Sequence, residues 1–217
     1  MKKIITIGRQ FGSGGREVGQ KVAQALHIAY YDKELLMVAA KTSGLSRQFM
    51  NTYDEKPTRS FLYSLVMGQR GLFPDSAETT VEQLAANAQR DAILAVAGEG
   101  SCVIVGRCAD HVLRNEQGLL RVFLTADHGD RIQRICRRDS VTTAEAEEKL
   151  QRMDRSRAAY YRFRCDQTWG AAANYDLCIN VSRWGVDAAV ETIVERCGRA
   201  QELTVRNIEH GDILKHS

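Results

Sequence analysis

Short apolar runs alternate with amphipathic stretches along most of this chain. The apolar runs predict five β-strands, at residues 4–7, 28–31, 102–105, 119–125 and 177–181. Apolar residues at helical spacing predict helices between them, at about residues 15–26, 33–41, 79–97, 128–138, 143–164 and 186–200. This alternation is typical of a parallel sheet with right-handed crossovers. We therefore predict an α/β fold with a five-stranded parallel sheet flanked by helices.

Polar residues stand where the predicted strands end. In open α/β sheets, ligands bind beyond the carboxyl ends of the strands. The polar residues found at such ends are Asp32, Arg107 with Asp110, Asp127, and Ser182 with Arg183. We expect the functional site along this edge of the sheet.

The first strand runs into a glycine-rich loop and then into an amphipathic helix. Residues 8–19 contain five glycines. Residues without side chains let backbone N–H groups converge on an anion, and a helix N-terminus adds about half a positive charge. The order of strand, loop and helix therefore predicts a phosphate cradle, with a simple glycine-rich turn as the alternative. A standard Walker A motif has lysine near the start of the helix, but this chain has Gly15 or Arg16 there.

Composition narrows the class of protein. With 217 residues and 44% hydrophobic content, the chain can bury a full core, and we predict one domain over residues 1–200. A net charge of only +3 argues against a nucleic-acid-binding protein. No apolar run reaches the roughly 18 to 20 residues of a membrane span, and the N-terminus has no secretory h-region. Six scattered cysteines without a C-x-x-C pair favour the cytoplasm.

Two segments stand apart from the strand and helix pattern. Residues 43–78 have weak periodicity and contain both prolines, and we expect an insertion that binds substrate, with a loop without a role as the alternative. The polar tail, residues 201–217, is expected to be a docking arm or partly disordered.

Arginines gather at two places late in the chain. The first group lies on the predicted helix at 128–138. The second is an R-x-D-R-x-R pattern formed by Arg152, Asp154, Arg155 and Arg157. Three guanidinium groups so close repel one another unless an anion or a carboxylate lies among them, and their forks match phosphate oxygens. A transferring phosphoryl group calls for such donors on a segment that can close over it. We therefore predict a lid at about residues 139–165.

Taken together, these motifs resemble the cytidylate kinase-like family, among the P-loop nucleoside monophosphate kinases. The resemblance covers roughly residues 3–197, and its motifs are the glycine loop, YYDKELL, VGRCAD, the arginine helix at 128–138 and QRMDRSR. It implies a P-loop NTPase-type core, a monophosphate-binding insertion after the second strand and an arginine-bearing lid. It also implies ATP and Mg²⁺ as cofactors, and CMP or dCMP as the phosphoryl acceptor.

The resemblance assigns roles to individual residues. The donor phosphates would be cradled by Gly12, Ser13, Gly14 and Gly15. The arginines near the donor nucleotide would be Arg131 and Arg134. The acceptor would be contacted by Asp32, Arg107 and Asp110. The lid motif would be Arg152, Asp154, Arg155 and Arg157, with Asp154 facing substrate.

The chain departs from the family's pattern in the phosphate loop. Arg9 or Arg16 can replace the charge of the missing lysine, although an arginine fork differs in shape from an ammonium group. No Ser or Thr follows the loop to hold Mg²⁺, so the metal ligands stay open, with Asp32 or Asp110 as substitutes. Two other functions therefore stay open: a nucleotide-binding regulator without turnover, and a kinase of another small molecule. A homodimer also stays open.

Overall fold

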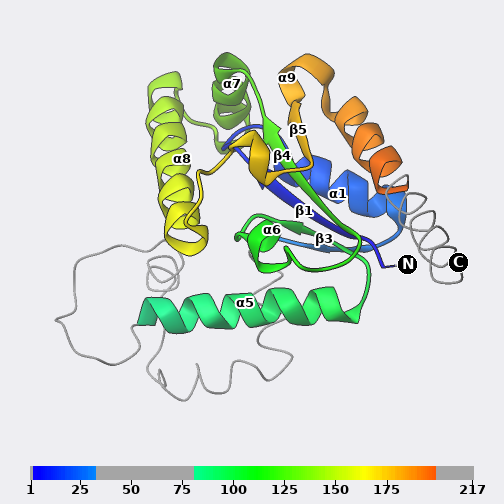
Figure 1. Ribbon diagram of the computed structural model, residues 1–217. Coiled ribbons are helices and arrows are strands. Elements are labelled where there is room, and N and C mark those ends of the chain that lie inside the picture. Colours follow the sequence, from blue (N-terminus) through cyan, green and yellow to red (C-terminus); the bar gives the residue numbers. More distant parts are fainter. Residues whose placement is uncertain (1, 33–80, 199–217) are drawn as a thin grey trace, which may run out of the picture.

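The computed structural model describes residues 2–32 and 81–198 (Figure 1). The predicted helix at 33–41, the insertion at 43–78 and the tail at 201–217 lie outside the described residues, so those predictions are untested. Within the described part, no helix combines the length and apolar character that a membrane span requires.

Five parallel strands form one sheet in the order β2-β3-β1-β4-β5. The strands are β1 (Ile4–Arg9), β2 (Ala29–Tyr31), β3 (Cys102–Val105), β4 (Leu119–Thr125) and β5 (Leu177–Asn180). All five predicted strands are confirmed. The last one ends a residue earlier than expected because the Asn180 side chain accepts a hydrogen bond from the Ser182 N–H and starts a short helix.

Helices connect the strands as the sequence predicts. The long ones are α1 (Gly15–Leu26), α5 (Val81–Glu99), α7 (His128–Asp139) and α8 (Thr143–Cys165), with a further helix over residues 186–198. Three short turns of helix were not predicted, namely α6 (Ala109–Val112), η1 (Ala172–Asn174) and α9 (Val181–Trp184). Elements of three or four residues are too short to show a helical period in the sequence.

The two faces of the sheet have separate cores. Ile5 and Ile7 of β1 pack toward α1 and the helix at 186–198, whereas Ile4 packs toward α5 and α6. Successive side chains of a strand point to opposite faces, so a strand buried on both sides is mostly apolar. Each fully buried isoleucine contributes about 1.5–3 kcal/mol. In Figure 1, α5 covers one face of the sheet and α1 the other.

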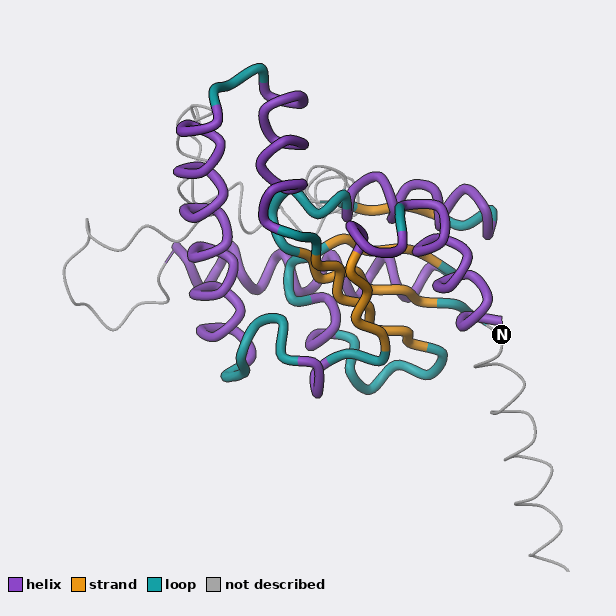
Figure 2. The backbone as a smooth tube through the Cα atoms, turned by 90° about the horizontal axis from the view of Figure 1, so that it is seen from above, coloured by secondary structure: helices purple, strands orange, loops and turns teal. Residues whose placement is uncertain are grey.

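The α7 and α8 helices form an antiparallel pair beside the carboxyl edge of the sheet (Figure 2). α8 begins with a capping box, in which Thr142 and Glu145 exchange side-chain and backbone hydrogen bonds. Phe11 of the glycine loop packs between the pair, against Ile135 and Leu150. The loop is therefore attached to these helices through an apolar contact as well as to the sheet.

Candidate functional site: an arginine-rich cavity over the glycine loop

The loop between β1 and α1 turns at two glycines with left-handed backbones, Gly12 (φ 81°) and Gly14 (φ 85°). A Cβ atom on Gly12 would lie 2.8 Å from the carbonyl oxygen of Arg131, and one on Gly14 would lie 3.2 Å from Cζ of Arg134. The backbone conformation thus favours glycine at both positions, and at Gly12 the space requires it as well. Because α1 begins at Gly15, the unpaired N–H groups of its first turn face the loop. The loop has the backbone of an anion cradle.

Arg131 and Asp154 support this loop from beneath. The Phe11 N–H donates to Oδ1 of Asp154 at 2.8 Å, and Nε of Arg131 donates to the Phe11 carbonyl at 2.7 Å. The two side chains also form an ion pair, and Arg131 is only 6% exposed. The structure therefore places both residues under the loop, and neither lines the cavity above it. Ser13 is also buried, and its hydroxyl donates to the Gln10 carbonyl at 2.9 Å.

A cavity of about 1020 Å³ opens over the loop, at the upper end of the range typical of small-molecule sites. The loop, the start of α1, and the α7 and α8 helices line it. Eight of its described lining residues are cationic and only Glu17 and Asp139 are acidic; the cations are Arg9, Arg16, Arg107, Arg134, Arg137, Arg138, Lys149 and Arg157. Such an excess favours a polyanionic ligand.

The arginines nearest the sheet raise the electrostatic potential of the cavity. Burial lowers the pKa of Arg9 well below its ordinary value, and the charges of Arg157 and Arg107 lower it further. Burial also lowers the pKa of Arg157 to about 10, with Asp154 opposing that shift. An arginine keeps its charge at neutral pH, so these shifts reflect first the burial of the guanidinium groups and second the crowding of like charges. An anion in the cavity would relieve it.

The two candidates for the missing lysine lie toward β2 and β3. The guanidinium of Arg9 lies against Gly106 at the end of β3, where a Cβ atom would come within 1.8 Å of Nη1. Arg16 pairs with the buried Asp32 at the end of β2, at 3.3 Å. Arg134 instead lies directly against Gly14, with Nη1 at 2.7 Å from Glu17.

Of the three arginines in the predicted lid motif, only Arg157 reaches the cavity. Arg157 lines it and donates from Nη1 to the Arg9 carbonyl at 2.9 Å. Arg155 instead hydrogen-bonds Gln151 on its own helix, and Arg152 lies 3.9 Å from Glu148. Both are exposed, so the arginine motif is divided between two faces of α8.

Sequence reasoning missed several lining residues. The buried ring of Phe11 lies under two guanidinium groups, with Cζ of Arg138 at 4.8 Å and Cζ of Arg157 at 5.4 Å from its centroid. Lys149 pairs with Asp139, whose carboxyl pKa is lowered by Arg138 and by this lysine. An aromatic residue within a glycine loop, with arginines at helical spacing elsewhere, was the available signal.

Arg107 stands on an unusual turn. Gly106, Arg107 and Cys108 have φ of 83°, 64° and 54°, so three consecutive residues are left-handed. For Arg107 and Cys108 this costs about 1–3 kcal/mol each, a cost typical of functional positions. The turn directs Arg107 into the cavity, but Asp110 faces the core. That carboxylate is 7% exposed, its pKa is raised by burial, and it accepts a hydrogen bond from the Tyr161 hydroxyl at 2.6 Å.

The described residues contain no cluster of three or more His, Cys, Asp or Glu side chains that could hold a metal ion. Of the two substitutes for a metal ligand, Asp110 is turned toward Tyr161 and Asp32 is paired with Arg16. The charged residues that line the cavity in the described part of the chain are mainly cationic.

The strand order, with a glycine loop between the central strand and α1, defines a P-loop kinase-type α/β fold. The chain belongs to the cytidylate kinase-like family, whose sequence profile matches residues 4–183. It is similar to the cytidylate kinase of Methanopyrus kandleri, at 24% identity over 212 residues that cover 89% of this chain and 95% of that protein. The cytidylate kinase of Pyrococcus horikoshii is 26% identical over 204 residues, 89% of each chain.

Solved structures support the same fold. A crystal structure of a protein from Eubacterium ventriosum matches with a TM-score of 0.69 at 28% identity, over 91% of this chain and 99% of that one. A shikimate kinase from Bacteroides thetaiotaomicron matches with a TM-score of 0.50 at 16% identity, over 90% and 98%. The relatives support a nucleotide-binding phosphotransferase of the kinase class, and this class implies the use of ATP and usually of Mg²⁺.

Proposed function

We propose that this protein transfers the γ-phosphoryl group of ATP to a nucleoside monophosphate, and that CMP or dCMP is the acceptor. The observation that carries the proposal is the glycine cradle beneath a cavity in which eight cations face two acids. Phosphoryl transfer needs positioning and charge stabilisation rather than a covalent nucleophile, and these residues supply both.

On the donor side, the backbone of Gly12, Ser13, Gly14 and Gly15 would bind the ATP phosphates. Arg134, which lies against Gly14, would add a charged hydrogen bond to them. Arg131 does not touch the donor in this proposal; it fixes the loop through the Phe11 carbonyl. Mg²⁺, when bound with ATP, would offset charge on the phosphates, held mainly by phosphate oxygens and water.

On the acceptor side, we assign the acceptor phosphate to Arg107. Arg9 lies between this residue and the loop, against Gly106, so it is placed to stabilise the phosphoryl group in transit. Arg16 and Asp32 form a pair at the end of β2 that would orient the acceptor. Arg157 bridges the two sides because it is fixed to the Arg9 carbonyl.

The glycine loop also favours a second candidate function. It has no lysine, and the Ser13 hydroxyl is engaged by the Gln10 carbonyl. A nucleotide-binding regulator without turnover would tolerate both features, whereas a kinase must supply the charge from elsewhere.

An acceptor screen tests the proposal. The purified protein is incubated with ATP, Mg²⁺ and, in turn, CMP, dCMP, AMP or shikimate, and ADP and the phosphorylated acceptor are separated by chromatography. We expect CDP or dCDP to appear in equal amount with ADP. ATP binding without product from any acceptor would favour the regulator, and product from another acceptor alone would assign a different kinase.

A further inference from the structure

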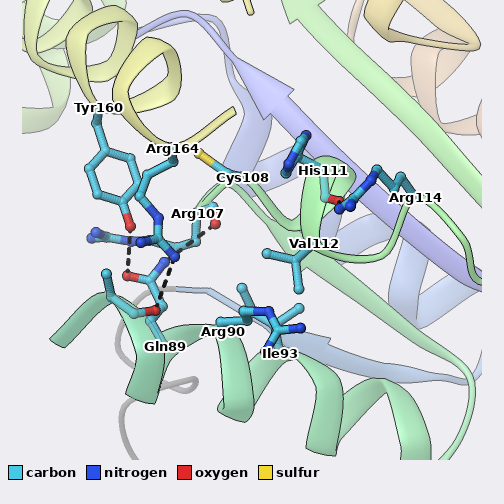
Figure 3. A pocket seen from close by; sticks show the side chains of 11 residues that line it. Gln89, Arg90, Ile93, Arg107, Cys108, His111, Val112, Arg114, Tyr160 and Arg164 are labelled. Atoms are coloured by element: carbon cyan, nitrogen blue, oxygen red, sulfur yellow. Dashed lines mark hydrogen bonds between the residues drawn. The ribbon is translucent and has the colours of Figure 1, made fainter. Parts of the chain in front are cut away.

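A second cavity, of about 300 Å³, adjoins the cavity over the glycine loop. The two share Arg107 and Tyr160 as lining residues. The second cavity lies between α5, the segment that follows β3 and the C-terminal half of α8, as Figure 3 shows. We call it the α5–α8 cavity.

The α5–α8 cavity is cationic. Its charged lining residues are Arg90, Arg107, Arg114 and Arg164, joined by His111, and none of its described lining residues is acidic. One of these cations has an acidic neighbour, since Asp91 lies 3.8 Å from Arg90 at the exposed surface, whereas Asp110 accepts a hydrogen bond from Tyr161. Guanidinium groups gathered around so small a volume repel one another, and an anion among them would lower that repulsion.

Hydrogen bonds fix the walls of this cavity. Gln89 donates from Nε2 to the Arg107 carbonyl at 3.4 Å, and its Oε1 accepts from the Tyr160 hydroxyl at 3.3 Å. One amide thus ties α5 to both other walls. Arg164 donates from Nη2 to the Ala86 carbonyl at 3.4 Å. In Figure 3 the side chains of Arg107, Arg164 and Tyr160 gather above Gln89. The backbone of Arg107 and the side chain of Arg164 are therefore held by protein contacts.

We propose that the α5–α8 cavity binds a phosphate or carboxylate group of a small molecule, held chiefly by Arg107 and Arg164. A guanidinium group only donates hydrogen bonds, so it matches an anion bidentately, whereas a neutral base also needs acceptors for its own N–H groups. The volume suits one small group. The anionic group can belong to the phosphoryl acceptor or to a separate ligand. The inference concerns binding alone and does not depend on phosphoryl transfer.

Titration with inorganic phosphate, followed by NMR, tests the proposal. The backbone amides of His111 and Val112 report on this cavity, because both residues line it and neither lines the larger one. We expect these resonances to shift on addition of phosphate. Arg164→Gln should raise the dissociation constant for phosphate at least about tenfold. Arg164→Lys keeps the charge but loses the forked guanidinium, so its dissociation constant for phosphate should lie between those of the parent and Arg164→Gln.

Arg162→Gln is the matched control, since Arg162 is exposed, lies on the same helix and lines neither cavity. It should bind phosphate as the parent does. If Arg164→Gln does not fold, Arg90→Gln makes the same test at an exposed position. The proposal fails if the two amides do not respond to phosphate, or if the Arg162 and cavity variants weaken binding equally.

Addition of CMP then identifies the source of the anionic group. Displacement of phosphate from the α5–α8 cavity would assign the group to the acceptor, and simultaneous binding would assign it to a separate ligand; the site stands in both cases. If CMP does not bind at all while the Arg164-dependent phosphate site persists, only the proposed acceptor is wrong.

Discussion

The carboxylate of Asp154 accepts a hydrogen bond from the backbone N–H of Phe11 at 2.8 Å. A residue in the middle of α8 therefore fixes the shape of a loop that lies 143 positions earlier in the chain. The same carboxylate pairs with the buried Arg131, which holds the Phe11 carbonyl. Both peptide groups of Phe11 are thus engaged, and the cradle is rigid where a phosphate would bind.

Removal of this support should loosen the loop. We expect Asp154→Ala to lower the free energy of unfolding by about 3–5 kcal/mol, because Arg131 would stay buried without its partner. ATP affinity should fall as well. Thermal unfolding and calorimetric titration with ATP measure the two effects. Glu148→Ala removes an exposed carboxylate from the same helix and should change neither; equal effects of the two substitutions would contradict the assigned role.

The glycine cradle makes a sharper prediction. Gly14→Val should abolish ATP binding while the protein stays folded, because the side chain disfavours a φ of 85° and would contact Arg134. Gly129→Ala is the control, since a Cβ atom there meets nothing within 4 Å. Unchanged ATP affinity in a folded Gly14→Val protein would remove the loop from the site.

How far the sequence determines this picture differs between elements. The central strands were predicted because a strand buried on both faces is mostly apolar, as β3 is throughout and as the buried part of β1 is apart from Thr6. The support that Arg131 and Asp154 give to the glycine loop was not predicted. Helical spacing indicates which residues share a face of a helix, but not whether a loop covers that face. The division between Arg157 and the exposed Arg155 depends on the same tertiary packing.

The exposed lid arginines lead to a prediction about motion. If Arg152 and Arg155 act on the phosphates, α8 must shift when donor and acceptor bind, since both arginines now contact their own helix. We expect an ATP analogue with CMP to slow hydrogen exchange in α8, and Arg155→Ala to lower kcat more than it raises KM for ATP. Equal hydrogen exchange with and without the ligands, together with full activity of Arg155→Ala, would show that Arg152 and Arg155 only form a solvent-exposed face of α8.

Burial of Asp110 predicts a pH effect on stability. Its pKa is raised in the folded protein, so ionisation is more costly there than in the unfolded chain, where the pKa is about 3.9. Stability from this group is complete below the unfolded pKa and is lost as pH rises through the folded pKa. Asp110→Asn does not titrate, so its melting temperature relative to the parent should rise between about pH 3 and pH 7.

The exposed Asp166, at the end of α8, supplies the control for that comparison. Asp166→Asn keeps a residue that tolerates the left-handed backbone, and it removes the same carboxylate charge as Asp110→Asn does. Parallel curves for Asp110→Asn and Asp166→Asn would contradict the account of the buried carboxyl.

The central claim is that arginine replaces the lysine of the phosphate loop in a working kinase, and the rate of CDP formation from ATP and CMP tests it most directly. We predict measurable turnover by the parent and a kcat at least about tenfold lower in Arg9→Ala, or about 1.4 kcal/mol of transition-state stabilisation. Arg162→Ala, an exposed arginine away from both cavities, should turn over at the parental rate. Parental rates in Arg9→Ala, in Arg16→Ala and in the double variant would contradict the claim.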